Sequence, residues 1–334
     1  MKRRDFIVFG GAAIATPFAA RAQSSSKPVI GFVNSGDASP LTFSPLKTAF
    51  EQGLSAGGFV DGRDVVIEYR WAGGRYERLP ELLQDLLRRK AAVIVASGGM
   101  ISAKHAKDAT STVPILFIAA DDPVAHGFVQ SLSHPGGNAT GVSLNTIDTA
   151  QKRLEFLTRL VPNLKTVAAL VNPKSTAGVL SKIEIQQVEN AAKGFGLRLI
   201  PLEAGPDNDI EEAFALAVRE GVGGLAVNGD PFFRARAARI VSLAARHRIP
   251  TIYPWREYVE EGGLVSYGPT LRWAYRQVAD YASRILKGAK PSDLPVQLPS
   301  TYEVVINRNT AHALGVSLPR RLFAMSNEYI EEIP

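Results

Sequence analysis

Short apolar runs alternate with longer amphipathic segments along most of the chain. The apolar runs predict strands at residues 29–33, 65–69, 92–96 and 115–119 in the first half, and at 167–171, 198–202, 224–227 and 251–253 in the second. Most of them are rich in Val, Ile and Ala without polar alternation, which is typical of parallel strands buried on both faces. Between them, five leucines at residues 79–87 recur with the helical period and predict a helix with one apolar stripe.

The two halves of the chain share a plan of four strands with crossover helices. A turn-forming segment at residues 134–138 and an extended segment at 139–144 join them. A strand at 264–267, a helix at 271–286 and a strand at 303–306 follow, and we expect them to cross back and complete both lobes. The pattern predicts an α/β protein with two lobes. We expect lobe 1 to contain residues 28–140 and about 268–290, and lobe 2 to contain residues 141–267 and about 291–334.

Residues 1–22 have the features of an export signal. Lys2, Arg3 and Arg4 precede an apolar stretch that is short for a bilayer span, and small residues precede an expected cleavage site after Ala22. The adjacent arginines and the mild hydrophobicity resemble a twin-arginine signal. Because Lys2 stands where that pattern usually has Ser or Thr, the general secretory route stays open. Residues 23–27 form a polar leader, and no cysteine follows the signal that could carry a lipid anchor.

Composition excludes several classes of site. The chain has no cysteine, which excludes disulfides, thiol catalysis and thiolate metal sites. Without residues 1–22, which carry four positive charges and one negative, the formal net charge falls from +6 to +3. The remaining charge is too dispersed for a nucleic-acid-binding face. The five histidines are scattered, and the chain lacks nucleophile-elbow, P-loop and dinucleotide-binding motifs. We therefore expect a protein that is not an enzyme and has no metal or cofactor.

Small polar residues follow most of the expected strands. Open parallel sheets bind ligands beyond the carboxyl ends of their strands, so these residues are the candidates for a binding site. The candidates are Asn34, Ser35, Ser97, Gly98, Gly99, Asp121, Asp122, Asn172, Asn228, Asp230, Tyr253, Trp255 and Tyr267. Because both halves of the chain contribute to them, we expect two polar rims that face each other.

Two pairs of candidates have a second interpretation. Gly98 and Gly99 precede a helix, where free N–H groups favour a carboxylate or phosphate, but a tight turn also requires glycine. Asp121 and Asp122 either pair with a ligand ammonium group or cap a helix that we expect to begin at Pro123. We expect one aspartate to fulfil each role.

Aromatic residues are concentrated between positions 253 and 267. Trp255 and Tyr267 lie beside turn residues and are candidates for stacking on a ligand, although aromatic side chains are more often part of a core. We expect Tyr258 to pack in a short helix. Arg256 either binds an anion or neutralises nearby glutamates.

A series of short segments is shared, in order and spacing, with a known family. They are residues 29–36 (VIGFVNSG), 67–72 (IEYRWA), 122–124 (DPV), 135–142 (PGGNATGV), 170–173 (LVNP), 228–233 (NGDPFF), 249–253 (IPTIY) and 304–307 (VVIN). The chain thereby resembles the substrate-binding proteins of a bacterial ABC-transporter family that includes tryptophan- and phenylalanine-binding members. The resemblance spans nearly all of the chain after the signal.

The resemblance implies a type I periplasmic-binding-protein fold, in which two Rossmann-like lobes with parallel sheets are joined by three crossovers. It implies a monomer that closes on a small ligand by a hinge motion and then contacts an inner-membrane permease transiently. Together with the export signal, the missing lipid-anchor cysteine leads us to expect a freely diffusing periplasmic receptor. The strand-end positions that match the family's site are Asn34, Ser35, Ser97, Asp121, Asn172, Asn228, Asp230 and Tyr267.

The expected ligand combines a carboxylate for the glycine pair, an ammonium group for the acidic residues and a planar group for the aromatic residues. An aromatic or branched amino acid fits best, and an aromatic carboxylate is the rival. The rival would leave Asp121 or Asp230 without an ammonium partner. Two other interpretations stay open: an exported binding protein that serves a sensor, and an exported enzyme on the same scaffold.

Overall fold

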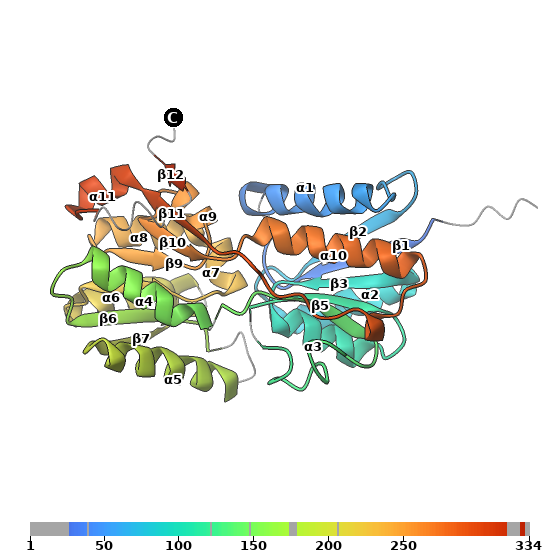
Figure 1. Cartoon of the computed structure of the whole chain (residues 1–334), viewed down its shortest axis with the longest axis horizontal. Helices are drawn as coiled ribbons and strands as arrows, with labels where there is room; N and C mark the ends of the chain where they lie inside the picture. Colours follow the sequence, from blue (N-terminus) through green and yellow to red (C-terminus); the bar gives the residue numbers. More distant parts are fainter. Residues whose placement is uncertain are drawn as a thin grey trace, which may run out of the picture.

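Both halves of the chain fold around a sheet, at the positions where the sequence predicts apolar runs. The computed structural model describes residues 27–38, 40–120, 122–146, 148–173, 179–205, 207–318 and 328–330. Two α/β lobes lie side by side, with lobe 1 on the right of Figure 1 and lobe 2 on the left. The predicted fold class is confirmed. The expected export signal at residues 1–22 lies outside the described residues.

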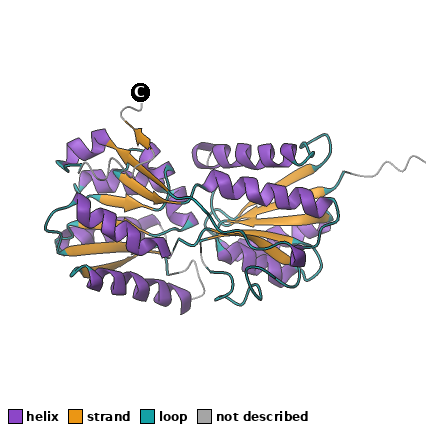
Figure 2. Cartoon of the chain, viewed as in Figure 1, coloured by secondary structure: helices purple, strands orange, loops and turns teal. Residues whose placement is uncertain are grey.

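The sheet of lobe 1 has five parallel strands in the order β2-β1-β3-β4-β5. Its strands are β1 (Val29–Asn34), β2 (Val66–Trp71), β3 (Ala91–Ser97), β4 (Ile115–Ala119) and β5 (Ala139–Ser143). One face is covered by α1 (Pro40–Ala56) and α10 (Leu271–Leu286), and the other by α2 (Leu79–Arg88) and α3 (Met100–Ala109) (Figure 2). The short helices η1 (Tyr76–Arg78) and η2 (Pro291–Asp293) complete the lobe. The central strands are buried on both faces, as their apolar sequences predict.

The sheet of lobe 2 has seven strands in the order β12-β11-β10-β9-β8-β6-β7, all parallel except for the antiparallel pair β10 and β11. Its strands are β6 (Thr166–Val171), β7 (Arg198–Glu203), β8 (Gly224–Val227), β9 (Thr251–Tyr253), β10 (Val265–Gly268), β11 (Glu303–Asn307) and β12 (Glu328–Ile330). One face is covered by α4 (Asp148–Leu160), α5 (Val179–Gly194) and α11 (Arg308–Leu314). Helices α6 (Asp207–Arg219), α7 (Pro231–Ala235), α8 (Ala237–Arg246) and α9 (Glu257–Glu260) pack against the other face.

The chain passes between the lobes three times: after β5, after β10 and after residue 297. Helix α10 follows β10 but packs in lobe 1, and β11 then returns to the sheet of lobe 2. The boundary expected after residue 140 falls inside β5, which pairs with β4 along its whole length. Val296 and Gln297 donate backbone hydrogen bonds to Leu132 and Gly141. Lobe 1 therefore extends to residue 143 and, after α10, to residue 297, because these segments cover the open edge of its sheet.

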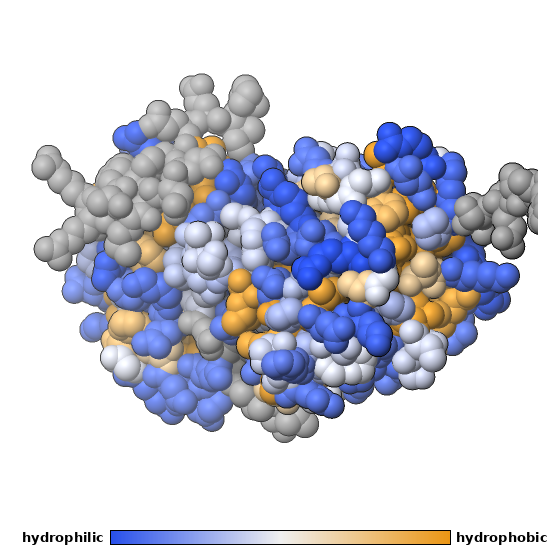
Figure 3. Space-filling view, turned by 45° about the vertical axis from the view of Figure 1, so that its right-hand side comes forward, coloured by the Kyte–Doolittle hydropathy of each residue, from blue (hydrophilic) through white to orange (hydrophobic). Residues whose placement is uncertain are grey.

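Few large hydrophobic side chains are exposed in the part of the chain that the structure describes. Hydrophilic residues cover much of the face seen in Figure 3, and apolar residues occupy separate areas between them. The most exposed large hydrophobic side chains of the described ranges are Val124, Phe195, Val218 and Leu298, which lie on different segments. Across those ranges, no helix is both long enough and apolar enough to cross a membrane.

Candidate functional site

The carboxyl ends of the two sheets enclose a cavity of about 40 Å³ between the lobes. Lobe 1 lines it with Asn34, Gly98, Gly99, Ile118, Ala120, Leu271 and Tyr275. Lobe 2 lines it with Gly229, Pro231, Arg234 and Trp255, and Leu144 of the first crossover completes it. Strand-end residues of both lobes thus meet at one place, as expected for open parallel sheets.

Predicted site residues of lobe 1 form a buried hydrogen-bond network. Asn34 Nδ2 donates to Ser97 Oγ at 2.7 Å, and Asn34 Oδ1 accepts from the Gly36 N–H at 2.7 Å. Ser35 Oγ donates to the carbonyl oxygen of Gly98 at 2.6 Å. Asn34, Ser35 and Ser97 are each at most 2% exposed. These bonds tie the loop after β1 to the loop after β3, and they fix the shape of the lobe 1 rim.

The glycine pair after β3 is required by its backbone geometry. Gly98 and Gly99 have φ angles of +85° and +86°. Residues other than glycine rarely adopt this backbone conformation. A Cβ atom on Gly98 would lie 2.7 Å from the backbone nitrogen of Ser35. Both glycines line the cavity, and Gly99 immediately precedes α3. The tight-turn interpretation therefore holds, and anion binding by this turn stays a prediction.

Asp230 has a structural role at the rim of lobe 2. Its Oδ1 accepts hydrogen bonds from the N–H groups of Phe232 at 2.7 Å and Phe233 at 3.3 Å, so it caps α7. Such a cap stabilises a helix by about 1 kcal/mol. Asn172 Nδ2 donates to the same oxygen at 3.3 Å. Asn172, Asn228 and Asp230 are all buried at the carboxyl end of the lobe 2 sheet. A second role for Asp230, as the partner of a ligand ammonium group, stays a prediction.

Of the two aspartates after β4, only the second belongs to the described part of the chain. Asp121 lies outside the described residues. Asp122 is exposed, and its Oδ1 accepts from the Val124 N–H at 2.8 Å, so it caps the segment that follows. The helix expected to begin at Pro123 is absent, because residues 123–127 form hydrogen-bonded turns. Gly127, with a φ angle of +62°, reverses the chain before a second helical turn can form.

Of the three aromatic candidates, Trp255 is the one that lines the cavity. Its side chain is 4% exposed, and its Nε1 has no hydrogen-bond partner in the described structure. Tyr253 stacks on Tyr258 at 4.8 Å between ring centroids and belongs to the core of lobe 2. Burial raises the pKa of Tyr253. Tyr267 stacks on Tyr302 at 5.9 Å on the side of the sheet covered by α4, away from the cavity lining.

Arg234 is a cavity residue that the strand-end pattern missed. It belongs to α7 and is 8% exposed. Glu257 of α9 is 6% exposed and electrostatically coupled to it. Burial raises the pKa of the Glu257 carboxyl, and the charge of Arg234 opposes this rise. The sequence signal was the position of Arg234 four residues after Asp230, one helical turn into the helix that follows a strand end.

Tyr275 is a second residue of the cavity that the sequence analysis missed. It comes from α10, and its side chain is hydrogen-bonded to Ser97. Burial raises the pKa of Tyr275, while this hydrogen bond lowers it. Its place in the site depends on the second crossover, which returns α10 to lobe 1.

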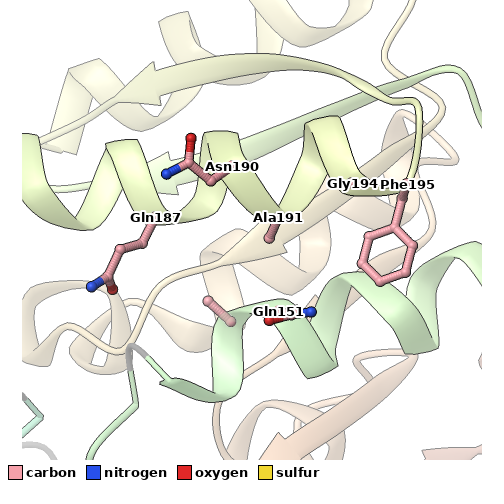
Figure 4. A pocket seen from close by; sticks show the side chains of 7 residues that line it. Gln151, Gln187, Asn190, Ala191, Gly194 and Phe195 are labelled. Carbon is pink, nitrogen blue, oxygen red and sulfur yellow. The ribbon is translucent and has the colours of Figure 1, made fainter.

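A larger groove of about 550 Å³ lies between α4 and α5 on the outer side of lobe 2 (Figure 4). Small side chains and the backbone of Gly194 form part of its wall, with Gln151, Gln187 and Asn190 on α4 and α5 and Phe195 at one end. All of its lining residues belong to one lobe, so a ligand there would not bridge the lobes. None of the residues predicted for the site lies in it.

Within the described ranges, no group of three or more His, Asp or Glu side chains could hold a metal ion. The charged side chain of the cavity is the guanidinium of Arg234, beside two aromatic rings from opposite lobes, Trp255 and Tyr275. This arrangement suits a small ligand that has an anionic group and a flat apolar group.

The chain is similar to known proteins whose names or structures involve binding of an amino acid or another substrate. A tyrosine-binding protein of Clostridioides difficile (strain R20291) is 27% identical over 286 residues, which are 85% of this chain and 80% of that protein. The structure of an ABC domain in complex with L-Trp from Streptococcus pneumonia is 26% identical, with a TM-score of 0.82 over 91% of this chain and 100% of the other. The ligand-free, open structure of a substrate-binding protein with adhesive properties from Clostridium difficile is 26% identical, with a TM-score of 0.63 over 91% and 99%.

A model of one protein family also matches most of the chain. The family model described as ABC transporter substrate binding protein matches residues 38–330, which include lobe 2 as far as β12, lobe 1 from α1 onwards, and every strand-end residue of the cavity except Asn34. The resemblance noted in the sequence is thereby confirmed. This chain belongs to the ABC transporter substrate-binding protein family.

Proposed function

We propose that this protein is the periplasmic receptor of an ABC importer and that it binds an aromatic amino acid, or a related aromatic carboxylate, between its lobes. The observation that carries the proposal is the cavity shared by both lobes, in which Arg234 lies with Trp255 and Tyr275. A tyrosine-binding relative and a similar structure in complex with L-Trp support the same ligand class.

Arg234 is the residue that would bind the carboxylate of the ligand. A guanidinium group matches a carboxylate in charge and geometry, and a pair of parallel hydrogen bonds between them is strong. The turn at Gly98 and Gly99 approaches from the opposite lobe and can add backbone N–H donors. Trp255 and Tyr275 would then hold the planar part of the ligand.

Ligand entry requires the lobes to separate. A cavity of about 150 Å³ can hold a benzene molecule, whereas the interlobe cavity measures about 40 Å³. The TM-score is 0.82 with the L-Trp complex and 0.63 with the ligand-free, open structure, at equal identity, which supports a closed arrangement of the lobes here. In our proposal the ligand enters an open form, displaces the ring of Trp255 or Tyr275, and is retained when the hinge closes.

Titration calorimetry with the protein lacking residues 1–22 tests this function. The panel should contain L-tryptophan, L-tyrosine, L-phenylalanine, L-leucine, benzoate and indole-3-acetate. We expect binding of at least one aromatic member. Arg234→Lys keeps the charge but loses the planar donor pair, so it should weaken that binding roughly tenfold to a hundredfold. Arg219→Lys on the exposed side of α6 is the control. Absence of binding to every panel member would refute the proposed ligand class.

Export is the second part of the proposal. The basic start, the short apolar stretch and the small residues before Gln23 support cleavage after Ala22 and release into the periplasm. Replacing Arg3 and Arg4 by lysine should abolish export if the twin-arginine route is used. Cell fractionation with an antibody against the protein would measure this. Continued export of the variant would favour the general secretory route, and retention of the wild-type protein in the cytoplasm would refute periplasmic localisation.

A further inference from the structure

The two lobes also touch outside the cavity, along one side of the cleft. Tyr76 and Asp37 of lobe 1 contact Asn172 and Arg236 of lobe 2. None of these four residues lines the cavity. We call them the interlobe latch. These contacts lie outside the lining of the cavity and join the rims of the two lobes directly.

The first half of the latch is a hydrogen-bond chain. Asn172 Nδ2 donates to Tyr76 Oη at 3.3 Å and to Asp230 Oδ1, also at 3.3 Å. Asp230 is fixed because it caps α7, so Asn172 joins the phenol of lobe 1 to a rigid part of lobe 2. Burial raises the pKa of Tyr76, and the charge of Asp230 raises it further. The phenol therefore stays protonated at physiological pH.

The second half of the latch is centred on Arg236. Its guanidinium lies over the ring of Phe232, 3.9 Å from the centroid, and its Nη1 donates to the carbonyl oxygen of Phe232 at 3.3 Å. The same Nη1 lies 3.9 Å from Asp37 Oδ2 of lobe 1. Stacking holds the guanidinium in place before the lobes meet, so the ion pair with Asp37 costs little side-chain entropy.

A glycine turn brings lobe 1 close enough for these contacts. Gly73 and Gly74 have φ angles of +68° and +74°, and they connect β2 to the helical turn that holds Tyr76. A Cβ atom on Gly74 would lie 3.7 Å from Phe232 Cδ2 and 3.9 Å from Arg236 Nη1. The turn therefore approaches α7 directly, and the latch lies where the rims of the two lobes meet.

We propose that Tyr76 and Arg236 are affinity-determining residues, which stabilise the closed arrangement of the lobes and slow ligand release without touching the ligand. This inference rests on the proposed function, since it assumes that closure retains a ligand. An interaction made only in the closed form shifts the equilibrium towards closure by its own free energy. Its loss therefore increases the dissociation rate and leaves the chemistry of the cavity unchanged.

Interlobe distance is the readout that separates this inference from the proposed function. The chain has no native cysteine, so Gln84→Cys on α2 and Glu212→Cys on α6 can be spin-labelled specifically. Both side chains are exposed, and they lie on opposite lobes. Double electron–electron resonance on this pair reports opening of the hinge. We expect Tyr76→Phe and Arg236→Met to shift the ligand-free distance distribution to longer values. We expect this shift in the ligand-free protein even if no member of the ligand panel binds.

Release kinetics complete the test, with L-tryptophan as the probe and stopped-flow fluorescence as the method. Loss of one neutral hydrogen bond or one partly exposed ion pair should accelerate release roughly two- to tenfold. The matched controls are Tyr281→Phe, whose hydroxyl donates to Pro295 within lobe 1, and Arg239→Met, whose partner Glu211 is also in lobe 2. We expect both controls to behave as wild type. Unchanged distances in the two latch variants, or equal changes in the controls, would overturn the inference.

Discussion

At the scale of single residues, Glu257 is the clearest case of an electrostatic cost inside the fold. Its side chain is 6% exposed, and Oε2 has no hydrogen-bond partner in the described part of the chain. Burial raises the pKa of its carboxyl, and the nearby charge of Arg234 does not cancel this rise. Burial therefore opposes ionisation of Glu257 more strongly than the charge of Arg234 favours it, and an ionised carboxyl at this position costs stability.

This cost predicts the effect of Glu257→Gln. A raised folded-state pKa means that the folded state binds a proton more tightly than the unfolded chain. The stability contributed by that proton is complete at pH values below the unfolded pKa and is lost as pH rises through the folded pKa. Glutamine cannot ionise, so the variant should melt at a higher temperature than wild type near neutral pH, and the difference should shrink on acidification. Melting curves from about pH 4 to about pH 8 would measure it.

The control for this prediction is Glu261→Gln. Glu261 directly follows α9 and is exposed to solvent. We expect its melting temperature to follow that of wild type at every pH. If Glu257→Gln is destabilising at neutral pH instead, then the attraction between Glu257 and Arg234 exceeds the cost of burying the carboxylate.

The sequence predicted the role of a residue only where that role depends on its neighbours along the chain. Asn34 and Ser97 could be placed at the rim because each ends an apolar run, and the structure indeed puts both at strand ends. Tyr76 could not be found in this way, because its contact with Asn172 joins residues 96 positions apart across the cleft. No pattern in either segment reveals which rim positions meet when two lobes close.

At the scale of elements, α1 and α10 pack unusually closely on one face of the lobe 1 sheet. A Cβ atom on Gly53 of α1 would lie 2.7 Å from Ala279 Cβ and 2.9 Å from the carbonyl oxygen of Arg276, both on α10. One helical turn later, a Cβ atom on Gly57 would lie 2.4 Å from Ser283 Cβ. Small residues on both helices therefore permit this contact, and it anchors the segment that returns from lobe 2.

Gly53→Ala should destabilise the protein for this reason. Alanine favours a helix over glycine by about 1 kcal/mol, but overpacking a tight contact costs about 1–3 kcal/mol. The close distance to backbone at Arg276 makes the second effect larger. Gly194→Ala at the end of α5 is the matched control, because nothing lies within 4 Å of its Cβ position. Urea denaturation should show opposite signs for the two variants, and a stabilised Gly53→Ala protein would contradict the packing argument.

Element types could be predicted well, and element partners could not. Apolar runs located ten of the twelve strands to within one or two residues, since burial on both faces leaves a strong local signal. The segment expected as an extended connection at residues 139–144 is β5 of the lobe 1 sheet, and β12 was not predicted. The pairing of α10 with α1 left no such signal, because it depends on the second crossover after β10. The expected helix at Pro123 was wrong because Gly127 imposes a turn that outweighs the helix-start pattern.

At the scale of the whole molecule, two cavities compete as the place where a ligand acts. The groove between α4 and α5 is larger, about 550 Å³ against about 40 Å³ between the lobes. If the lobes open as we propose, the interlobe cavity is enlarged and the groove within lobe 2 is not, so the volume in one arrangement of the lobes does not decide between them. A ligand in the groove would contact lobe 2 alone, and it would not couple to closure.

Hydrogen exchange decides between these two places. With a ligand that binds in calorimetry present at about 100 times its Kd, the folded state gains about 2.7 kcal/mol. If the ligand bridges the lobes, slower exchange should appear together at residues 98–100 of lobe 1 and residues 229–234 of lobe 2, because closure buries both rims. Residues 187–195 beside the groove should exchange as in the ligand-free protein. Exchange measured by mass spectrometry resolves these segments, and protection restricted to residues 187–195 would assign the ligand to the groove and contradict closure.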